Sequence, residues 1–127
     1  MGLLLLVAAG VAVGFTAANV VPLTNAGVYT DTTSLAELSP GPCAGLTLTH
    51  LVVSTTGTVT GTAANDLILD ATNAKNGTLT GGAGNDCIVS GGSKVTIDGG
   101  AGSNDVCIGT GFRPTFLNCE ATYTGLS

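Results

Sequence analysis

The stretch GGAGNDCIV, residues 81–89, decides the fold expected for this chain. A glycine-rich turn ends in Asn-Asp and is followed at once by a short apolar triplet. Similar stretches lie on either side, GTAANDLIL at 61–69 and DGGAGSNDVCI at 98–108. Repeats with a period of about twenty residues are typical of chains that stack one coil upon the next. The pattern therefore predicts a parallel β-solenoid.

Short apolar or β-branched triplets continue this pattern on both sides of the repeat. Each is too short to be a stable strand alone, and no hairpin dipeptide joins one to the next. Residues alternate between the two faces of a strand, so Ile68, Ile88 and either Val106 or Ile108 are expected in the core. After residue 108 the periodicity ends, and the remaining residues are expected to cap the solenoid. The triplets lie at 51–53, 58–60, 67–69, 78–80, 87–89, 95–97 and 106–108.

The composition suits such a fold and narrows the function. The 127 residues include 20 Gly, only two Tyr and three Phe, and no Trp, so few large rings are available for a core. Lys and Arg number 3 against 8 Asp and Glu, which argues against capture of DNA, RNA or anionic membranes. Acidic groups on a glycine-rich chain instead suggest a hard cation, although the net charge of −5 also serves solubility.

Four cysteines lie outside the hydrophobic N-terminal stretch. They form no CxxC pair and no cluster with His50, so a zinc site is not expected. An even number of cysteines in a small exported domain predicts two disulfides, with three possible pairings. The loop between the last two cysteines can close on itself, which favours Cys107 with Cys119 and leaves Cys43 with Cys87.

The first 23 residues, MGLLLLVAAGVAVGFTAANVVPL, contain no charge. A helix of that length would cross a bilayer core of about 30 Å. A cleaved signal peptide, a membrane anchor and an assembly helix are the three possible interpretations. The stretch lacks the basic n-region of a signal and the flanking basic residues of an anchor, which favours an assembly helix. Its small residues would let copies of the helix approach closely.

This stretch resembles the mature N-terminus of type IV pilins and their pseudopilin relatives. The resemblance implies removal of a short basic leader, transient insertion in the inner membrane, and packing with copies of itself in the core of an extracellular filament. Leu5 stands where most bacterial members of the family carry a glutamate. The residues that carry the resemblance are Gly14, Ala17, Ala18 and Pro22.

The expected fold class is therefore α+β, with one long N-terminal hydrophobic helix and a small β-solenoid head. The helix is expected over residues 1–23, and the head over residues 43–127. Residues 24–42 are rich in Thr, Ser, Gly and Pro and are expected to form a linker, with one short turn around Ser34–Leu38.

Residues 81–89 also fit the GGxGxDxUx nonapeptide of parallel β-rolls and resemble RTX-type, haemolysin-like calcium-binding repeats. The resemblance implies Ca²⁺ between turns one coil apart, with one site between Asp66 and Asp86 and another between Asp86 and Asp105. The opposite turns, 70–77 and 90–94, each carry a lysine and are expected to be free of metal. Alternatively, Asn-Asp ends these turns only through local hydrogen bonding. The residues assigned to calcium are Asp66, Gly81, Gly82, Gly84, Asp86, Asp98, Gly99 and Asp105.

No sequence motif of catalysis is present, and His50, the only histidine, lies in an alternating segment that suggests a structural position. The chain is therefore not expected to be an enzyme. The predicted function is a structural subunit of an extracellular, cell-surface filament, assembled through the membrane, with calcium as its cofactor and no nucleic-acid partner. The alternative is a monomeric, membrane-anchored calcium-binding β-roll that acts as an adhesin or binding module.

Overall fold

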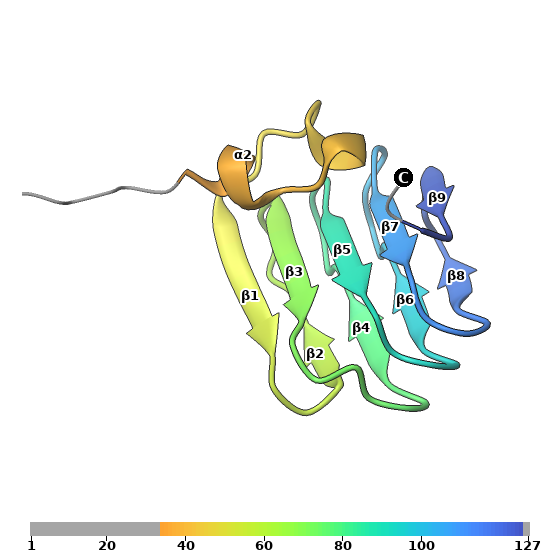
Figure 1. The fold of residues 1–127 in the computed structure, drawn as a ribbon. Helices are drawn as coiled ribbons and strands as arrows, with labels where there is room; N and C mark the ends of the chain where they lie inside the picture. Colours follow the sequence, from red (N-terminus) through yellow and green to blue (C-terminus); the bar gives the residue numbers. More distant parts are fainter. Residues whose placement is uncertain (1–33, 126–127) are drawn as a thin grey trace, which may run out of the picture. The chain divides into compact units, whose positions relative to one another are not determined.

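The computed structural model describes residues 34–125, which form two parallel sheets joined coil by coil into a β-solenoid (Figure 1). Successive strands alternate between a five-stranded sheet, in the order β1-β3-β5-β7-β9, and a four-stranded sheet, in the order β2-β4-β6-β8. The predicted solenoid is thereby confirmed. The strands are β1 (His50–Ser54), β2 (Thr58–Thr60), β3 (Asp66–Asp70), β4 (Thr78–Thr80), β5 (Cys87–Ser90), β6 (Thr96–Asp98), β7 (Val106–Gly109), β8 (Thr115–Leu117) and β9 (Ala121–Tyr123).

The core lies between the two sheets and consists of ladders of side chains from successive coils. Ile68 pairs with Ile88, and Ile88 pairs with Cys107, in the parallel register of β3, β5 and β7. The expectation for Ile68 and Ile88 is confirmed, but the third member of the ladder is Cys107 and neither Val106 nor Ile108. The reason is the period of two, which turns the second residue after each turn-ending aspartate inward. Opposite this ladder lie Leu79, Val95 and Ile97.

The outer face of the five-stranded sheet is buried as well. Leu67, Cys87, Val106 and Ile108 form a second apolar cluster there. Segment 35–48 covers this cluster, packing Leu35, Leu46 and Leu48 against it. The short helix α2 (Leu35–Leu38) and the 3-10 turn η2 (Gly41–Cys43) lie in this segment. Two-sided burial explains why these strands are apolar at consecutive positions and do not alternate.

The expected α+β class is wrong for the part of the chain that the structure describes. Its only α-helix is α2, which has four residues. Helix α2 cannot extend, because Pro40 and Pro42 follow it and each lacks a backbone donor. No helix within residues 34–125 has the length and apolar character needed to span a membrane. The helix expected over residues 1–23, with Gly14, Ala17, Ala18 and Pro22, lies outside the described residues.

The solenoid also continues further than the sequence pattern predicts. Strand β8 pairs with β6 and strand β9 pairs with β7, so both sheets gain a strand after residue 108. The triplets of these strands, TFL and ATY, contain aromatic and polar residues in place of the small aliphatic residues of earlier coils. The apolar repeat is lost from the sequence here because most positions of β8 and β9 are exposed or half-buried, and polar or aromatic side chains occupy them.

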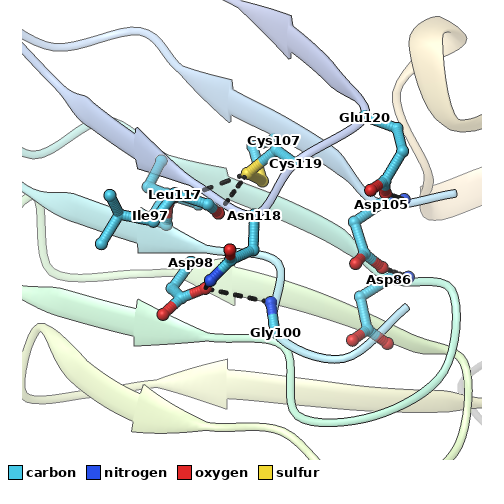
Figure 2. Close-up of a disulfide and its surroundings, with 10 residues drawn as sticks. All are labelled: Asp86, Ile97, Asp98, Gly100, Asp105, Cys107, Leu117, Asn118, Cys119 and Glu120. Atoms are coloured by element: carbon cyan, nitrogen blue, oxygen red, sulfur yellow. Dashed lines mark hydrogen bonds between the residues drawn. A yellow bond between two sulfur atoms is a disulfide. The ribbon is translucent and has the colours of Figure 1, made fainter. Parts of the chain in front are cut away.

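Two disulfides hold the coils together, in the pairing favoured from the sequence. Cys43 is bonded to Cys87, which attaches the covering segment to the outer face of β5. Cys107 is bonded to Cys119 and lies between the sheets, where it ties β7 to the turn before β9 (Figure 2). No free cysteine occurs among the described residues.

Candidate functional site

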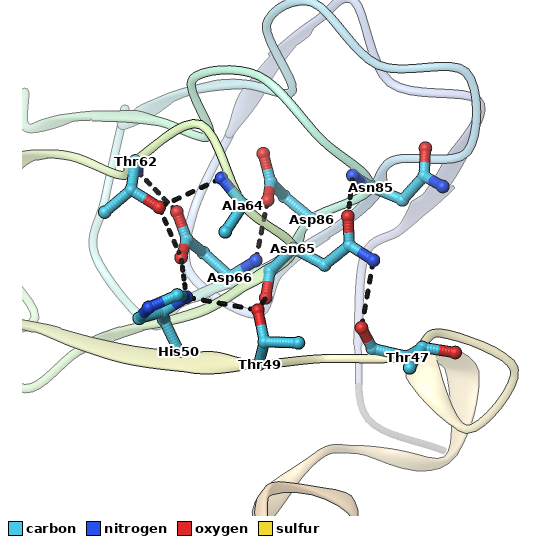
Figure 3. Close-up of polar contacts among 9 residues, drawn as sticks. All are labelled: Thr47, Thr49, His50, Thr62, Ala64, Asn65, Asp66, Asn85 and Asp86. Carbon is cyan, nitrogen blue, oxygen red and sulfur yellow. Dashed lines mark hydrogen bonds and ion pairs between the residues drawn. The ribbon is translucent and has the colours of Figure 1, made fainter.

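The turns that lead from the four-stranded sheet back to the five-stranded sheet carry a stack of buried carboxylates, called here the acidic edge. Asp66, Asp86 and Asp105 occupy the same place in three successive coils, and each is fully buried. Successive coils of a parallel sheet lie about 4.8 Å apart, so these three acids are close neighbours. Figure 2 shows Asp86 and Asp105 in one column with Glu120, and Figure 3 shows Asp66 beside Asp86.

Three of the acids, Asp86, Asp105 and Glu120, each use one oxygen to bind the backbone of the preceding coil, whereas Asp66 accepts hydrogen bonds from Thr62 in its own turn. Asp86 Oδ1 accepts a hydrogen bond from the backbone N–H of Asp66, at 2.8 Å. Asp105 Oδ1 accepts one from the N–H of Asp86, also at 2.8 Å. Glu120 Oε2 continues the series by accepting from the N–H of Asp105, at 2.6 Å. Asp86, Asp105 and Glu120 therefore each satisfy a donor that the parallel ladder leaves free at the start of the strand.

The second carboxylate oxygens of Asp86 and Asp105, called here the two inner aspartates, have no such bond. Asp86 Oδ2 and Asp105 Oδ2 are buried and have no hydrogen-bond partner. A Cβ on Gly81 would collide with Asp86 Oδ2 and with the carbonyl oxygen of Gly99. One coil further on, a Cβ on Gly99 would collide with Asp105 Oδ2 and with the carbonyl oxygen of Asn118. Glycine thus lets a carboxylate oxygen and a carbonyl oxygen both approach the same point of the turn, and two such oxygens repel unless a proton or a cation lies near them.

Burial and like charge make ionisation of these acids costly. Burial raises the pKa of Asp86 to about 6, and the neighbouring Asp105 and Asp66 carboxylates add to the rise, against a hydrogen bond from Asp66 that lowers it. Burial also raises the pKa of Asp105, where Glu120 and Asp98 act in the same direction. Both pKa values are raised because the carboxylates are stacked close together in a site of low dielectric, where the charged form is disfavoured.

Cationic side chains are scarce at this edge. His50 Nδ1 lies 3.9 Å from Asp66 Oδ1, at the exposed start of the stack (Figure 3). Within residues 34–125 this is the one contact between a basic and an acidic side chain at salt-bridge distance. Asp86 and Asp105 therefore have no cationic protein partner in the described part of the chain.

The remaining residues assigned to calcium do not contribute a carboxylate to the stack. Gly82 and Gly84 have φ values of 110° and 106°, which side chains disfavour, so the turn needs glycine there. Asp98 lies at the end of β6, and its Oδ1 accepts hydrogen bonds from Gly100 N at 3.0 Å and Asn118 Nδ2 at 2.8 Å (Figure 2). The structure therefore does not bring the Asp98 carboxylate into the stack.

Glu120 belongs to the acidic edge but is not among the residues assigned from the sequence. It lies fifteen positions after Asp105, whereas the aspartates are 20 and 19 positions apart. The shorter spacing and the absence of a preceding glycine pair hide it from the repeat pattern. Its only sequence signal is an acid placed directly before the triplet ATY.

The asparagines that precede the aspartates form a ladder of their own on the outside of the turns. Asn65 Oδ1 accepts a hydrogen bond from Asn85 N at 2.9 Å, and Asn85 Oδ1 accepts one from Ser103 N at 3.3 Å (Figure 3 shows the first). The Asn-Asp pair therefore links coils to one another. This hydrogen bonding explains why asparagine precedes the aspartate in these turns. It leaves one oxygen of each inner aspartate without a partner.

No group of three or more His, Cys, Asp and Glu side chains suited to a metal occurs within the described residues. Any cation at the acidic edge would therefore need backbone carbonyl oxygens beside one or two carboxylates, which Ca²⁺ accepts. Searches for similar proteins found no matching family model, no matching curated protein and no matching solved structure.

Proposed function

We propose that this chain is a structural subunit of an extracellular filament, and that its β-solenoid is a head held rigid by Ca²⁺ at the acidic edge. The single observation that carries the calcium part is the buried carboxylate stack. Asp86 and Asp105 are fully buried one coil apart, each with an unpartnered oxygen, and no cationic side chain of the described residues pairs with them. Buried charges of one sign are normally paired or bound to a metal.

The donors at this edge suit a hard cation. Carboxylate and carbonyl oxygens are the ligands that Ca²⁺ takes, in sets of six to eight. Oδ2 of Asp86 and the Gly99 carbonyl oxygen both lie close to Gly81, and Oδ2 of Asp105 and the Asn118 carbonyl oxygen both lie close to Gly99. Asp66 would contribute at the start of the stack. When bound, the ion would neutralise the carboxylates and join adjacent coils.

The two disulfides support the extracellular part of the proposal. Disulfides persist in oxidising compartments and are common in small exported domains that bury a limited core. Cys43–Cys87 spans 44 positions and Cys107–Cys119 spans 12, so both constrain the unfolded chain. A head of this kind would keep its shape outside the cell.

The filament part rests on the uncharged residues 1–23 and on their resemblance to type IV pilins. Copies of the chain would associate through this segment after transient insertion in the inner membrane, and the solenoids would face the outside. The alternative is a single membrane-anchored copy whose solenoid acts as an adhesin or binding module. The two proposals share the calcium-binding head and differ only in whether copies polymerise.

The calcium proposal is tested by the thermal midpoint of the full chain with Ca²⁺ and after EGTA treatment. A hundredfold excess of ligand over its Kd stabilises a protein by about 2.7 kcal/mol, which corresponds to roughly 10–20 °C for a domain of this size. We expect Asp86→Asn to abolish the response. Asp70→Asn, on the other edge of the solenoid, is the matched control and should keep it. The same midpoint with Ca²⁺ and with EGTA would refute calcium binding.

The filament proposal is tested by electron microscopy of material sheared from the surface of cells that make the chain. Filaments labelled by an antibody against the solenoid are expected. Recovery of the chain only as a detergent-extracted monomer would exclude polymerisation and favour the anchored alternative.

A further inference from the structure

All three basic residues of the chain lie on the other edge of the solenoid. Lys75, Lys94 and Arg113 belong to the turns that lead from the five-stranded to the four-stranded sheet, at the lower edge of Figure 1. The register of β4, β6 and β8 aligns Thr78, Thr96 and Thr115 in successive coils. The turns that precede these threonines are therefore stacked on one another, and each of the three carries one basic residue. The surface that these turns form is called here the basic edge.

The register gives the basic edge two columns of side chains. Asn76, Lys94 and Arg113 each lie two positions before the aligned threonines, and Lys75, Ser93 and Phe112 each lie three positions before them. Hydrogen bonds from Asn76 N to Ser93 O, at 3.0 Å, and from Lys94 N to Phe112 O, at 2.7 Å, fix the three turns against one another. The columns are therefore positioned by backbone pairing.

A cavity of about 280 Å³ lies between these columns, lined by Lys75, Asn76, Ser93, Lys94 and Phe112. Sites for small molecules in proteins have volumes of about 300–1,000 Å³, so this cavity has the size for one small ring. Two cations, an amide, a hydroxyl and an aromatic ring thus face one space. The cavity lies in the opposite turns from the acidic edge.

The cations here have no acidic partner within residues 34–125, because no ion pair to Lys75, Lys94 or Arg113 occurs there. Asp70 lies at the start of the first of these turns, but its carboxylate accepts hydrogen bonds from Thr72 and Ser90. A chain with a net charge of −5 therefore concentrates its whole positive charge at one edge. Such a concentration attracts an anion.

The backbone provides an independent observation. Asn76, Lys94 and Arg113 have φ values of 57°, 56° and 53°, which is the left-handed region. Glycine and asparagine adopt this conformation readily, whereas long side chains rarely do. Lysine and arginine occupy two of the three equivalent positions although the turn itself favours glycine or asparagine, so we expect these side chains to make a contact that the turn does not need.

Phe112 defines the ligand more narrowly. Its side chain is 61% exposed beside the cations, and the Arg113 guanidinium carbon lies 5.0 Å from the centre of its ring. A bare phosphate or sulfate ion would have no apolar surface to pack against the exposed Phe112 ring. A sugar ring that carries a carboxylate has an anionic group for the lysines, an apolar C–H face for the aromatic ring, and hydroxyls for Asn76 and Ser93.

We infer that the cavity at the basic edge binds one carboxylate-bearing pyranose unit of an acidic saccharide. Lys94 and Lys75 hold the carboxylate, and Phe112 packs against the ring. This inference does not rest on calcium or on filament formation, since the basic edge and the acidic edge are formed by different turns.

Asn76-Gly77-Thr78 is an N-glycosylation acceptor sequence, so the full chain is produced in a host that does not glycosylate it. Binding is measured by calorimetric titration with a disaccharide of glucuronic acid. The neutral disaccharide of glucose and inorganic sulfate are comparison ligands. Lys94→Asn reproduces the residue found one coil earlier, so we expect it to keep the thermal midpoint while weakening binding by about tenfold or more, the loss of one charge-assisted contact. Phe112→Ala should also weaken binding, and EGTA should leave it unchanged.

Ala44→Glu is the matched control, because it lowers the net charge by the same amount at the exposed residue that follows η2 and should not affect binding. The inference would be overturned by no binding of the acidic disaccharide at millimolar concentration, by equal binding of the neutral disaccharide, or by unchanged affinity in Lys94→Asn. Binding of sulfate as tight as that of the disaccharide would also overturn it, since the site would then recognise only an anion.

Discussion

The two edges of this solenoid have similar backbone construction and opposite electrostatics. Both consist of glycine-containing turns stacked coil upon coil, with backbone atoms of one turn packed against the next. On the acidic edge the charges are fully buried, at Asp66, Asp86 and Asp105. On the basic edge Lys94 and Arg113 are exposed at the tips of the turns.

The difference arises from where the charged residue lies relative to the strand. Each aspartate is either the first residue of a strand of the five-stranded sheet or the residue just before one. Its side chain is therefore enclosed by the turn. Lys94 and Arg113 lie at the left-handed tip of their turns and are exposed to solvent. A buried charge affects stability through pH and cations, whereas an exposed charge costs little and remains free for a ligand. We therefore propose that the acidic edge governs stability and that the basic edge binds a ligand.

The largest expected effect comes from adding a methyl group in the turns. A Cβ on Gly81 would collide with the Gly99 carbonyl oxygen, and a Cβ on Gly92 would collide with the Ala74 carbonyl oxygen. Gly81→Ala and Gly92→Ala should each lower the free energy of unfolding by about 3 kcal/mol or more, because the backbone of an adjacent coil must move. Chemical denaturation measures this.

The two glycine variants then differ in their response to Ca²⁺. Gly81→Ala should lose it, because the methyl group fills the space beside Asp86 Oδ2, while Gly92→Ala should keep it. Gly45→Ala is the control, since a Cβ there meets nothing within 4 Å. If both edges lost the calcium response equally, the assignment of calcium to the acidic edge would be wrong.

A smaller effect is expected from pH in the metal-free protein. The pKa of Asp86 is raised from 3.8 to about 6 in the folded state. The folded protein therefore holds this proton more tightly than the unfolded chain does, and the contribution to stability is fully present below pH 3.8 and is lost as pH rises through about 6. A shift of this size corresponds to about 3 kcal/mol at most.

The free energy of unfolding in EGTA, measured from pH 4 to pH 7.5, checks this expectation. Asp86→Asn should flatten the profile relative to the unmodified chain, because the amide keeps the acceptor for Asp66 N–H and has no charge to bury. A profile identical in the two proteins would show that Asp86 is not the group responsible.

The smallest effect, of opposite sign, is expected at Asp70 in the turn of the basic edge. Burial raises the pKa of Asp70, but hydrogen bonds from the Thr72 and Ser90 hydroxyls and from Thr72 N outweigh burial and lower it. The contribution of Asp70 is therefore present above its unfolded pKa of 3.8 and is lost as pH falls through the lower folded value. Asp70→Asn should cost about 1 kcal/mol at pH 7, the net value of a weakened hydrogen bond, and should remove this acid-side loss. A gain in stability at pH 7 would contradict this interpretation.

Much of the fold could be predicted from the sequence because the repeat is local. The spacing of Asp66, Asp86 and Asp105 and the glycine turns before them predict stacked coils, which the structure confirms. The two disulfides were also predicted, since a loop of 12 positions between Cys107 and Cys119 leaves one pairing for the other two cysteines. These features depend on short-range pattern and on chain connectivity.

Other features could not be predicted because they depend on contacts between distant segments. Segment 35–48 has few periodic apolar positions, yet Leu35, Leu46 and Leu48 cover the outer face of the five-stranded sheet. Glu120 joins the carboxylate stack at a spacing that breaks the repeat. The last two strands, β8 and β9, carry residues unlike those of the earlier coils and are recognised only by their pairing with β6 and β7.

By itself the sequence determined the coil, because glycine, the Asn-Asp turn end and the apolar triplet each impose a local backbone preference that recurs about every twenty residues. It also determined which turns carry acids and which carry lysines. Only the tertiary structure decided that the acids are buried with unpartnered oxygens while Lys75, Lys94 and Phe112 surround an open cavity. The physical reason is that burial and cavity shape depend on how coils stack in register, which no single turn specifies.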